Sequence, residues 1–429
     1  MHNSFTPDRG ASALWRGFFI AFSLSTAIVV PVNARDNAGG ALTLTEAIAR
    51  TLARNPELQA GGYTLLSADA FIDQAGLAPP LVAGGEVENF AGTGALSGVQ
   101  STETTLRLSR VIELGGKLDA RVLVADESRA LAAVEQQALR LDVLAEVARR
   151  FVLVVADQEQ LALARRATEL AERTLDLTGE RVAVGRAPVT EQNRAQIALA
   201  RARINEEHAG HQLKSSRLSL SVLWGATRPA YALASGALYT LSSMPEFPKL
   251  IANLEKNPDL ASFVTVGRLN EARLRLAETQ RTPDVQFSGG VRRLEQFDDQ
   301  AFVFSLSVPL GMDQQAAPEI AAASADYARV EFDAQAKRLE LRALLFGIYQ
   351  ELLHARTEAE TLRAEVLPKA EENLRQTEEG FRLGRYSFLE LTVAQAELLD
   401  IEREAIRAAR DYHSYIIEIE RLTGGAVTE

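Results

Sequence analysis

The sequence contains two copies of one unit, and this repeat constrains the fold more than any other feature. The segment 53–58 is matched at 255–260, and 180–199 aligns without a gap on 379–398. The offset is 202 residues at the first match and 199 at the second, so each copy should fold alike. We predict a first repeat over residues 35–225, a proline-containing connector over 226–248, and a second repeat over 249–429.

Each copy has the predicted order helix, strand, strand, long helix, turn, helix. The first helices are expected at about 45–77 and 249–280, each interrupted by an Asn-Pro pair, because proline cannot donate a backbone hydrogen bond. The long helices are expected at about 117–184 and 316–383, with a kink at Pro368. The second carries an apolar seam that steps alternately by four and three residues, which is typical of a coiled coil: Leu341, Leu345, Ile348, Leu352, Ala355, Ala359, Leu362 and Val366.

Strands are indicated where apolar and polar residues alternate with a period of two. This pattern occurs at 285–291 and 302–308 in the second copy, and at 106–109 in the first. The loops between paired strands are polar and glycine-rich. A fourth strand is expected after Pro80, because residues 80–82 match residues 283–285 and a glycine pair follows both. The chain therefore offers four strands, each with one apolar and one polar face.

Residues 1–34 are predicted to be a cleaved signal peptide. Arg9 and Arg16 precede an apolar run of 14 residues, and small residues stand before a cut after Ala34. The run is shorter than the roughly 20 residues of a membrane-spanning helix. Cleavage removes two of the 46 basic residues and one of the 57 acidic ones, which leaves 44 against 56 and a net charge of −12. We therefore expect export across an inner membrane.

Exported strands with one apolar face suit an outer-membrane barrel, in which lipid-facing and lumen-facing residues alternate. Four strands cannot close a barrel, because observed barrels begin near eight. The barrel would be shared between chains: two copies would supply about eight strands and three about twelve, and the spacing leaves both open. The alternative is a small sandwich in a soluble periplasmic protein, but that fold has no use for helices of roughly 100 Å.

These motifs, in this order and in two copies, resemble the TolC family of outer-membrane efflux proteins. The resemblance rests on Asn-Pro-x-Leu in the first helices, on Glu-Leu-Gly-Gly-Lys at 113–117, and on the turns 184–187 and 383–386. It covers nearly all of the mature chain. It implies a mainly α fold with a small β part, in which long antiparallel helices of three chains form a periplasmic α-barrel. Four strands per chain would form a shared twelve-stranded outer-membrane β-barrel.

The segment 108–117 is most similar to the outer-membrane subunits of heavy-metal exporters of the cobalt–zinc–cadmium type. The resemblance implies a homotrimeric, passive exit duct for divalent metal cations. Its partners would be a periplasmic adaptor (membrane fusion) protein and an inner-membrane pump of the resistance-nodulation-division class. The alternatives are a duct for drugs or organic solutes, the outer-membrane duct of a type I secretion system and, more remotely, a soluble periplasmic coiled-coil scaffold.

The resemblance also names site residues. The adaptor-docking surface would comprise the two turns, and Glu191 and Glu390, six residues past each turn glycine, would face the lumen as rings that attract cations. For these glutamates, simple charge placement in the first helical turn is the alternative. A second acidic position of the family is Val393 here. Arg186 and Arg385 are expected to pair with carboxylates and hold the tip shut. The turn residues are Val184, Gly185, Arg186, Ala187, Leu383, Gly384, Arg385 and Tyr386.

The sequence shows no catalytic or cofactor-binding pattern: no phosphate loop, no nucleophile elbow and no zinc-binding His-Glu-x-x-His. The absence of cysteine excludes thiolate metal sites and a lipidated N-terminal cysteine, and the acidic charge argues against nucleic acid. His208 and His211 lie three residues apart beside two glutamates, but a solvated helix face is the preferred interpretation. We therefore predict no enzyme, no cofactor and no bound metal.

Overall fold

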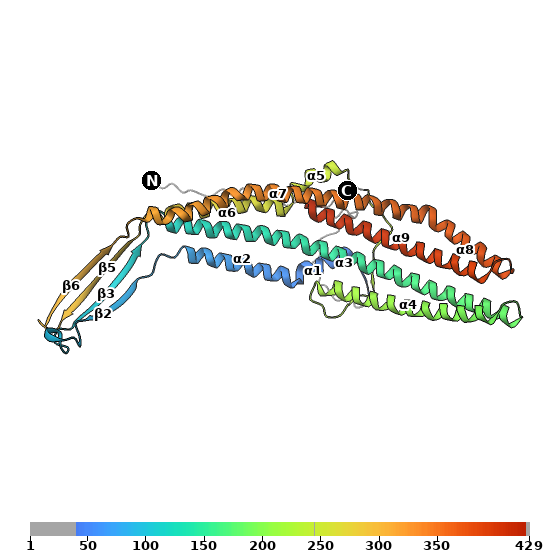
Figure 1. Cartoon of the computed structure of the whole chain (residues 1–429), viewed down its shortest axis with the longest axis horizontal. Coiled ribbons are helices and arrows are strands. Elements are labelled where there is room, and N and C mark those ends of the chain that lie inside the picture. The colour runs from blue at the N-terminus through green and yellow to red at the C-terminus, as the bar shows by residue number, and fades with distance from the viewer. Residues whose placement is uncertain (1–39, 244, 426–429) are drawn as a thin grey trace, which may run out of the picture. The chain divides into compact units, whose positions relative to one another are not determined.

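The computed structural model of the protein describes residues 40–243 and 245–425 (Figure 1). The signal peptide predicted at residues 1–34 lies outside these residues. The chain divides into two compact units, and each takes segments from both sequence repeats. The first unit holds residues 40–59, 139–257 and 339–425, and the second holds residues 60–138 and 258–338.

The second unit contains one antiparallel sheet of four strands in the order β2-β3-β5-β6 (Figure 1). These are the strands expected from the sequence. The central strands come from different repeats, so their pairing joins the two copies in one sheet. The outer edges of the sheet pair with no other strand of the described residues. The strands are β2 (Val82–Glu88), β3 (Glu103–Ile112), β5 (Val285–Leu294) and β6 (Asp299–Ser307).

The sheet has one apolar and one polar face, as the alternation predicts. Cross-strand pairing places Leu106 opposite Val291, and Val291 opposite Phe302, so these three side chains share a face. Phe302 is 93% exposed and Leu106 68%. On the other face, Arg292 lies 2.7 Å from Glu103 and 3.1 Å from Glu88. The apolar face is thus the open one, whereas a water-soluble sheet covers its apolar face.

Two helices enter the strand pairs, and each begins at the proline of its Asn-Pro pair, as expected. They are α2 (Pro56–Ala75) and α6 (Pro258–Thr279), and they follow α1 (Leu44–Arg54) and α5 (Phe247–Leu254). The asparagines explain why the interruption recurs in both repeats. The Nδ2 atom of Asn55 donates to the carbonyl oxygen of Leu223 at 2.9 Å, and that of Asn257 donates to Leu422 at 2.8 Å.

The long helices are present in both repeats. The first is continuous, as α3 (Lys117–Ala183), and is followed by α4 (Val189–Val222). The second runs as α7 (Met312–Thr361), a π-helical turn (Leu362–Val366) and α8 (Leu367–Arg382), and is followed by α9 (Phe388–Thr423). The π turn ends two residues before Pro368, which lacks a backbone donor, so the helix changes its hydrogen-bond register instead of ending. The predicted apolar seam is buried at Leu341, Leu345, Leu352, Ala355 and Ala359.

The core of the first unit lies between α3, α4 and α9. Val147 and Val154 of α3, Leu220 of α4 and Ala409 of α9 are fully buried in one cluster. A parallel pair of two-residue strands, β1 (Ala41–Leu42) and β4 (Leu233–Ala234), packs on this core. It was not predicted, because two residues are too few to show a period.

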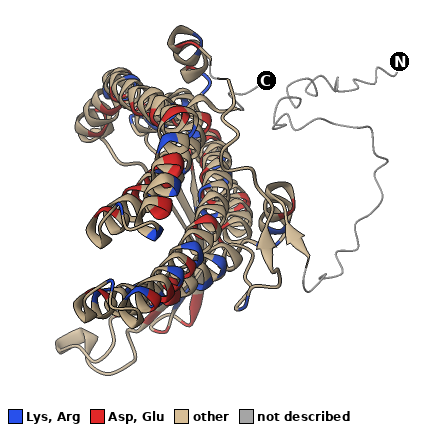
Figure 2. Cartoon of the chain, turned by 90° about the vertical axis from the view of Figure 1, so that its right-hand side faces the viewer, with Lys and Arg blue, Asp and Glu red and all other residues tan. Residues whose placement is uncertain are grey.

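The side chain of Gln158 fixes β4 to α3. Its Nε2 donates to the carbonyl oxygen of Ala234 at 2.9 Å, and its Oε1 accepts from the backbone nitrogen of Ala234 at 2.8 Å. Basic and acidic residues are mixed along the helices (Figure 2). None of the helices in the described part of the chain has the length and apolarity needed to cross a membrane.

Candidate functional site at the helical turns

Both long helices end in the same hydrogen-bonded turn, within the first unit. Gly185 follows α3 with a φ of 69°, and Gly384 follows α8 with a φ of 76°. The backbone nitrogen of Arg186 donates to the oxygen of Arg181 at 2.8 Å, and that of Arg385 donates to Gly380 at 2.7 Å. This pattern is a Schellman motif, which needs a left-handed residue, and glycine adopts that conformation without steric cost.

The turns expose apolar and basic side chains together. Val184 is 68% exposed, Leu383 59% and Tyr386 44%. Arg186 and Arg385 are exposed as well, and neither forms an ion pair with a described residue of this chain. The pairing predicted for these two arginines is therefore not made within one chain, and it stays a prediction for contacts between chains.

The two helices that leave the turns begin differently. Ser387 caps α9 in a capping box: its backbone nitrogen and Oγ both donate to Oε2 of Glu390, at 2.7 and 2.8 Å, and the Glu390 nitrogen donates to Oγ at 3.3 Å. The hydrogen bonds from the Ser387 backbone and side chain lower the pKa of Glu390. Glu390 is therefore ionised at neutral pH and also stabilises the first turn of its helix.

Glu191, the repeat equivalent of Glu390, has no such partner. The residue that corresponds to Ser387 is Pro188, which provides no side-chain cap for α4. The Oε2 atom of Glu191 is buried without a hydrogen-bond partner among the described residues. The two repeats thus differ at the capping position, which is Ser387 in one and Pro188 in the other. Because of this difference, Glu390 and Glu191 have different surroundings although they occupy equivalent positions.

One side chain, which the sequence did not single out, joins the two turns. Arg181, near the end of α3, donates from Nη1 to the carbonyl oxygen of Phe381 at 2.7 Å. Its guanidinium carbon also lies 4.2 Å from the centre of the Phe381 ring, and Phe381 is fully buried. A second link lies deeper, where Gln395 of α9 donates to Oγ1 of Thr174 on α3 at 2.8 Å.

The two repeats differ in sequence at the position of Arg181. Arg181 aligns with Gly380, so a long cation in one copy stands opposite a glycine in the other. A Cβ atom built at Gly380 would lie 2.1 Å from Cδ2 of Tyr386, so the glycine leaves room for the tyrosine ring. Tyr386 in turn replaces Ala187 of the first copy. At equivalent positions where the residues of the two repeats differ in size or charge, each repeat makes contacts that the other lacks.

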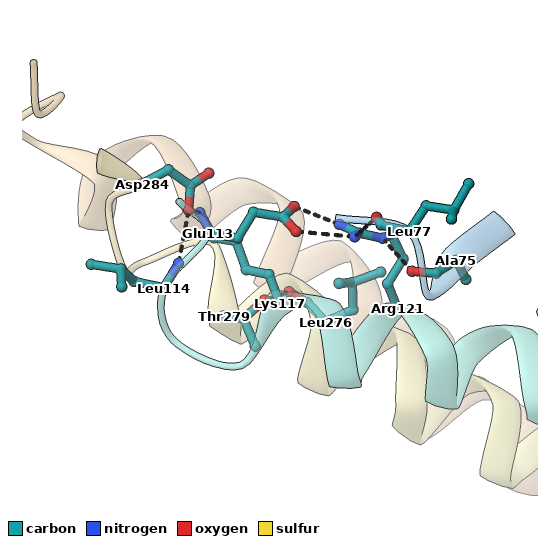
Figure 3. A network of polar contacts seen from close by, with 9 residues as sticks. All are labelled: Ala75, Leu77, Glu113, Leu114, Lys117, Arg121, Leu276, Thr279 and Asp284. Carbon is teal, nitrogen blue, oxygen red and sulfur yellow. Dashed lines mark hydrogen bonds and ion pairs between the residues drawn. The ribbon is translucent and has the colours of Figure 1, made fainter. Parts of the chain in front are cut away.

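The Glu-Leu-Gly-Gly-Lys motif forms a joint between sheet and helix in the second unit (Figure 3). Lys117 is only 4% exposed, and its Nζ lies 2.7 Å from Oδ1 of Asp284. The backbone nitrogen of Leu114 donates to the same oxygen at 3.2 Å. Gly115 has a φ of 74° and would bring a Cβ within 2.6 Å of Thr282, so no larger residue fits there. Asp284 thereby holds the turn after β3 next to the start of β5.

Arg121 extends this joint to the end of α2 (Figure 3). It forms a two-pronged ion pair with Glu113, at 2.6 and 3.0 Å, and donates to the carbonyl oxygens of Ala75 and Leu77 at 3.2 and 3.3 Å. These carbonyls lie at and just beyond the end of α2, where helical partners are missing. The motif therefore fixes α2, α3 and the sheet at one point.

The histidines considered in the sequence do not form a metal site in the described structure. His208 and His211 are exposed on α4. Across residues 40–243 and 245–425, no three His, Asp or Glu side chains are placed to hold a metal ion.

The sequence matches the outer membrane efflux protein family over residues 47–226 and 252–425. The chain belongs to this family. It is 28% identical to the cobalt-zinc-cadmium resistance protein CzcC of Cupriavidus metallidurans over 95% of this chain and 96% of that protein. It is 26% identical to the nickel-cobalt-cadmium resistance protein NccC of Alcaligenes xylosoxydans xylosoxydans over 58% of this chain and 57% of that protein.

The fold is shared with solved channel structures. CusC, for which transmembrane channel formation has been described, superimposes with a TM-score of 0.74 at 16% identity, over 96% of this chain and 95% of that one. This likeness confirms the predicted fold class. The family is one of efflux channels, so the protein is not an enzyme.

Proposed function

We propose that the protein is the outer-membrane channel of a tripartite efflux system that exports divalent heavy-metal cations. Three copies would form a passive duct from the periplasm through the outer membrane. A resistance-nodulation-division pump in the inner membrane would supply the energy, and a periplasmic adaptor would connect the two. The observation that carries this proposal is the incomplete sheet, with its exposed apolar face and its two unpaired edges.

The sheet is suited to completion by other copies of the same chain. Unpaired edge groups cannot remain in a bilayer, because no water is there to satisfy them. Pairing β6 of one copy with β2 of the next satisfies both edges at once. The exposed face with Leu106 and Phe302 would then contact lipid, and the face with Arg292 and its carboxylate partners would line the lumen.

Three copies fit a duct better than two. A barrel of about eight strands has an interior that side chains fill, and the diameter grows roughly in proportion to the number of strands, so about twelve strands give the wider lumen. The long helices α3 and α7, which are joined to the strands, would continue this passage on the periplasmic side. Trimeric assembly among members of this family supports the same number.

The turns are proposed as the docking surface for the adaptor. Leu383 and Tyr386 offer exposed apolar contacts, and Arg186 and Arg385 offer unpaired charges beside them. Tyrosine and arginine are enriched among the residues that dominate binding energy at protein interfaces. The rigid Schellman turns would present these side chains with little loss of entropy on binding.

Glu191 and Glu390 are proposed to favour cations at the entrance. In three copies each would form a three-fold ring, and rings of carboxylates attract cations and repel anions. Glu390 is held in its ionised form by Ser387. Metal export as such is supported by the names of the relatives CzcC and NccC. A duct also needs no tight metal site, because tight binding would slow release.

The proposal is tested by deleting the gene and measuring growth in Zn²⁺, Co²⁺, Ni²⁺ and Cd²⁺, with antibiotics and toluene in parallel. We expect lower tolerance of at least one metal, restored by the wild-type gene. We also expect the wild-type protein to be found in the outer-membrane fraction as a heat-resistant trimer. Unchanged metal tolerance with lost antibiotic or toluene tolerance would point to a duct for organic solutes. Absence of the protein from the outer membrane would contradict the channel itself.

A further inference from the structure

The loop between β2 and β3 has an unusual composition. Residues 89–102 contain no Asp, Glu, Lys or Arg, although 24% of the whole chain is charged. Three apolar side chains of the loop are open to the surroundings: Phe90 is 58% exposed, Leu96 42% and Val99 71%. Exposure of three large apolar groups in one short loop calls for a partner that covers them.

The loop has a defined fold of its own. The Ala91 nitrogen donates to the oxygen of Gly98 at 2.9 Å, the Gly92 nitrogen donates to Leu96 at 3.0 Å, and Ser101 Oγ donates to Ala95 at 2.9 Å. A 3₁₀ turn spans Gly94–Leu96. At Gly92 a Cβ would lie 2.9 Å from that of Leu96, so the small residue lets the loop close on itself. The apolar side chains are therefore held in place by an ordered loop.

The loop is attached to the polar face of the sheet. Asn89 has a φ of 56°, which turns the chain at the end of β2, and its Nδ2 donates to Oε1 of Glu103 at 3.2 Å. Glu103 is the carboxylate that pairs with Arg292 on the polar face. The loop also lies at the end of the sheet opposite to the attachment of α2 and α3. In the proposed barrel this is the lumen side of the outer mouth.

The neighbouring turn between β5 and β6 has the opposite character. It carries Glu295, Asp298 and Asp299 around Phe297, which is 63% exposed. Arg293 forms ion pairs with Glu295 and Asp298, so residues 293–299 hold one positive and three negative charges. Copies of this acidic turn would repel one another if they were brought together. Copies of the uncharged loop at 89–102 would not repel one another, and they would bury apolar surface on contact.

We propose that the β2–β3 loops of neighbouring copies meet over the polar face and form an apolar constriction at the outer mouth of the channel. This inference rests on the proposed trimeric duct. The occupant of the exposed apolar surface is the same loop of the adjacent copy, since Asn89 ties the loop to Glu103 on the polar face, which is the lumen side of the proposed barrel. A ring of Phe90, Leu96 and Val99 would hinder wetting of the mouth and so limit passage of hydrated ions.

The absence of cysteine allows a direct test in intact outer membranes. Val99→Cys introduces a single thiol into the loop, and Phe297→Cys introduces one at a similarly exposed site on the acidic turn. A disulfide needs Cα atoms within about 7 Å. Under copper–phenanthroline oxidation, we expect covalent dimers from Val99→Cys and few from Phe297→Cys. No dimer from Val99→Cys in intact trimers, or equal yields from both variants, would overturn the proposal.

Conductance in planar bilayers gives a second test. Replacing Phe90, Leu96 and Val99 together by Ser should raise single-channel conductance by about twofold or more, while Phe297→Ser should leave it unchanged. Equal conductance of the wild-type and triple-variant channels would overturn the proposed constriction but would not contradict the proposed function as a duct. Failure of the wild-type chain to form trimers or pores would instead overturn the proposed function, and this inference with it.

Discussion

The guanidinium of Arg181 lies 4.2 Å above the ring of Phe381 and donates to its carbonyl oxygen at 2.7 Å, so one side chain of α3 holds the end of α8. Loss of such a bond from a charged donor costs about 1.5–3 kcal/mol, which is roughly ten- to 150-fold in an equilibrium. Arg181→Gln should therefore loosen the two turns relative to each other. We expect larger single-channel conductance and increased sensitivity of cells to vancomycin.

Arg382 offers a matched control for this change. It lies one residue from Phe381, is exposed, and forms no ion pair with a described residue. Arg382→Gln should leave conductance and vancomycin sensitivity as in the wild type. Arg181→Lys keeps the charge but not the flat stacking group, and should give an intermediate effect. Equal behaviour of Arg181→Gln and Arg382→Gln would show that the contact does not restrain the turns.

Gly380→Ala should displace the Tyr386 ring from the turn. The added Cβ would lie 2.1 Å from Cδ2 of Tyr386, a distance that side chains do not tolerate. We expect weaker binding of the adaptor, by about tenfold or more if Tyr386 is an anchor, measured by surface plasmon resonance with the purified trimer. Gly347→Ala, on a helix with nothing within 4 Å of the new atom, should leave binding unchanged. Unaltered binding by Gly380→Ala would remove Tyr386 from the docking surface.

The sequence predicted the large elements well because their signals extend over many residues. The repeat, the Asn-Pro interruptions and the seam at Leu345 and Leu352 each recur, and both asparagines make the same cross-helix bond. The link from Arg181 to Phe381 was missed because it depends on how two hairpins pack, and a single arginine carries no period. Lys117 was identified only as part of a motif, since its burial becomes visible only when Asp284, 167 residues later, is placed beside it.

The capping box makes the charge of Glu390 sensitive to Ser387. Hydrogen bonds from Ser387 lower the pKa of Glu390 below its ordinary value of 4.5. Because the folded-state pKa is depressed, the stabilisation is complete above about pH 4.5 and is lost as the pH falls through the lower folded-state value. Ser387→Ala removes one of the two donors and should raise this pKa. When the cation selectivity of the channel is measured as a function of pH, the loss of selectivity on acidification (the acid limb) should then occur at higher pH.

Glu390→Gln controls this pH prediction. This change removes the carboxylate that titrates, so it should lower cation selectivity at neutral pH. The part of the acid limb that is due to Glu390 should then disappear. Glu191→Gln, at the repeat position that lacks a capping serine, should lower selectivity without changing the response to Ser387→Ala. An acid limb that does not move in Ser387→Ala would assign the titration to groups other than Glu390.

The ion pair between Lys117 and Asp284 joins the sheet to α3, and removing one partner should lower the stability of the trimer more than removing the other. Lys117 is 4% exposed, whereas the side chain of Asp284 is 31% exposed. Asp284→Asn leaves a buried, uncompensated ammonium and should cost about 2–4 kcal/mol. Lys117→Met removes the buried charge and leaves a carboxylate that water reaches, so it should cost about 1–2 kcal/mol. The dissociation temperature of the heat-resistant trimer should therefore fall further for Asp284→Asn. Arg129→Gln, which breaks an exposed pair with Asp69, should shift it little, and a larger fall for Lys117→Met than for Asp284→Asn would contradict this account of the joint.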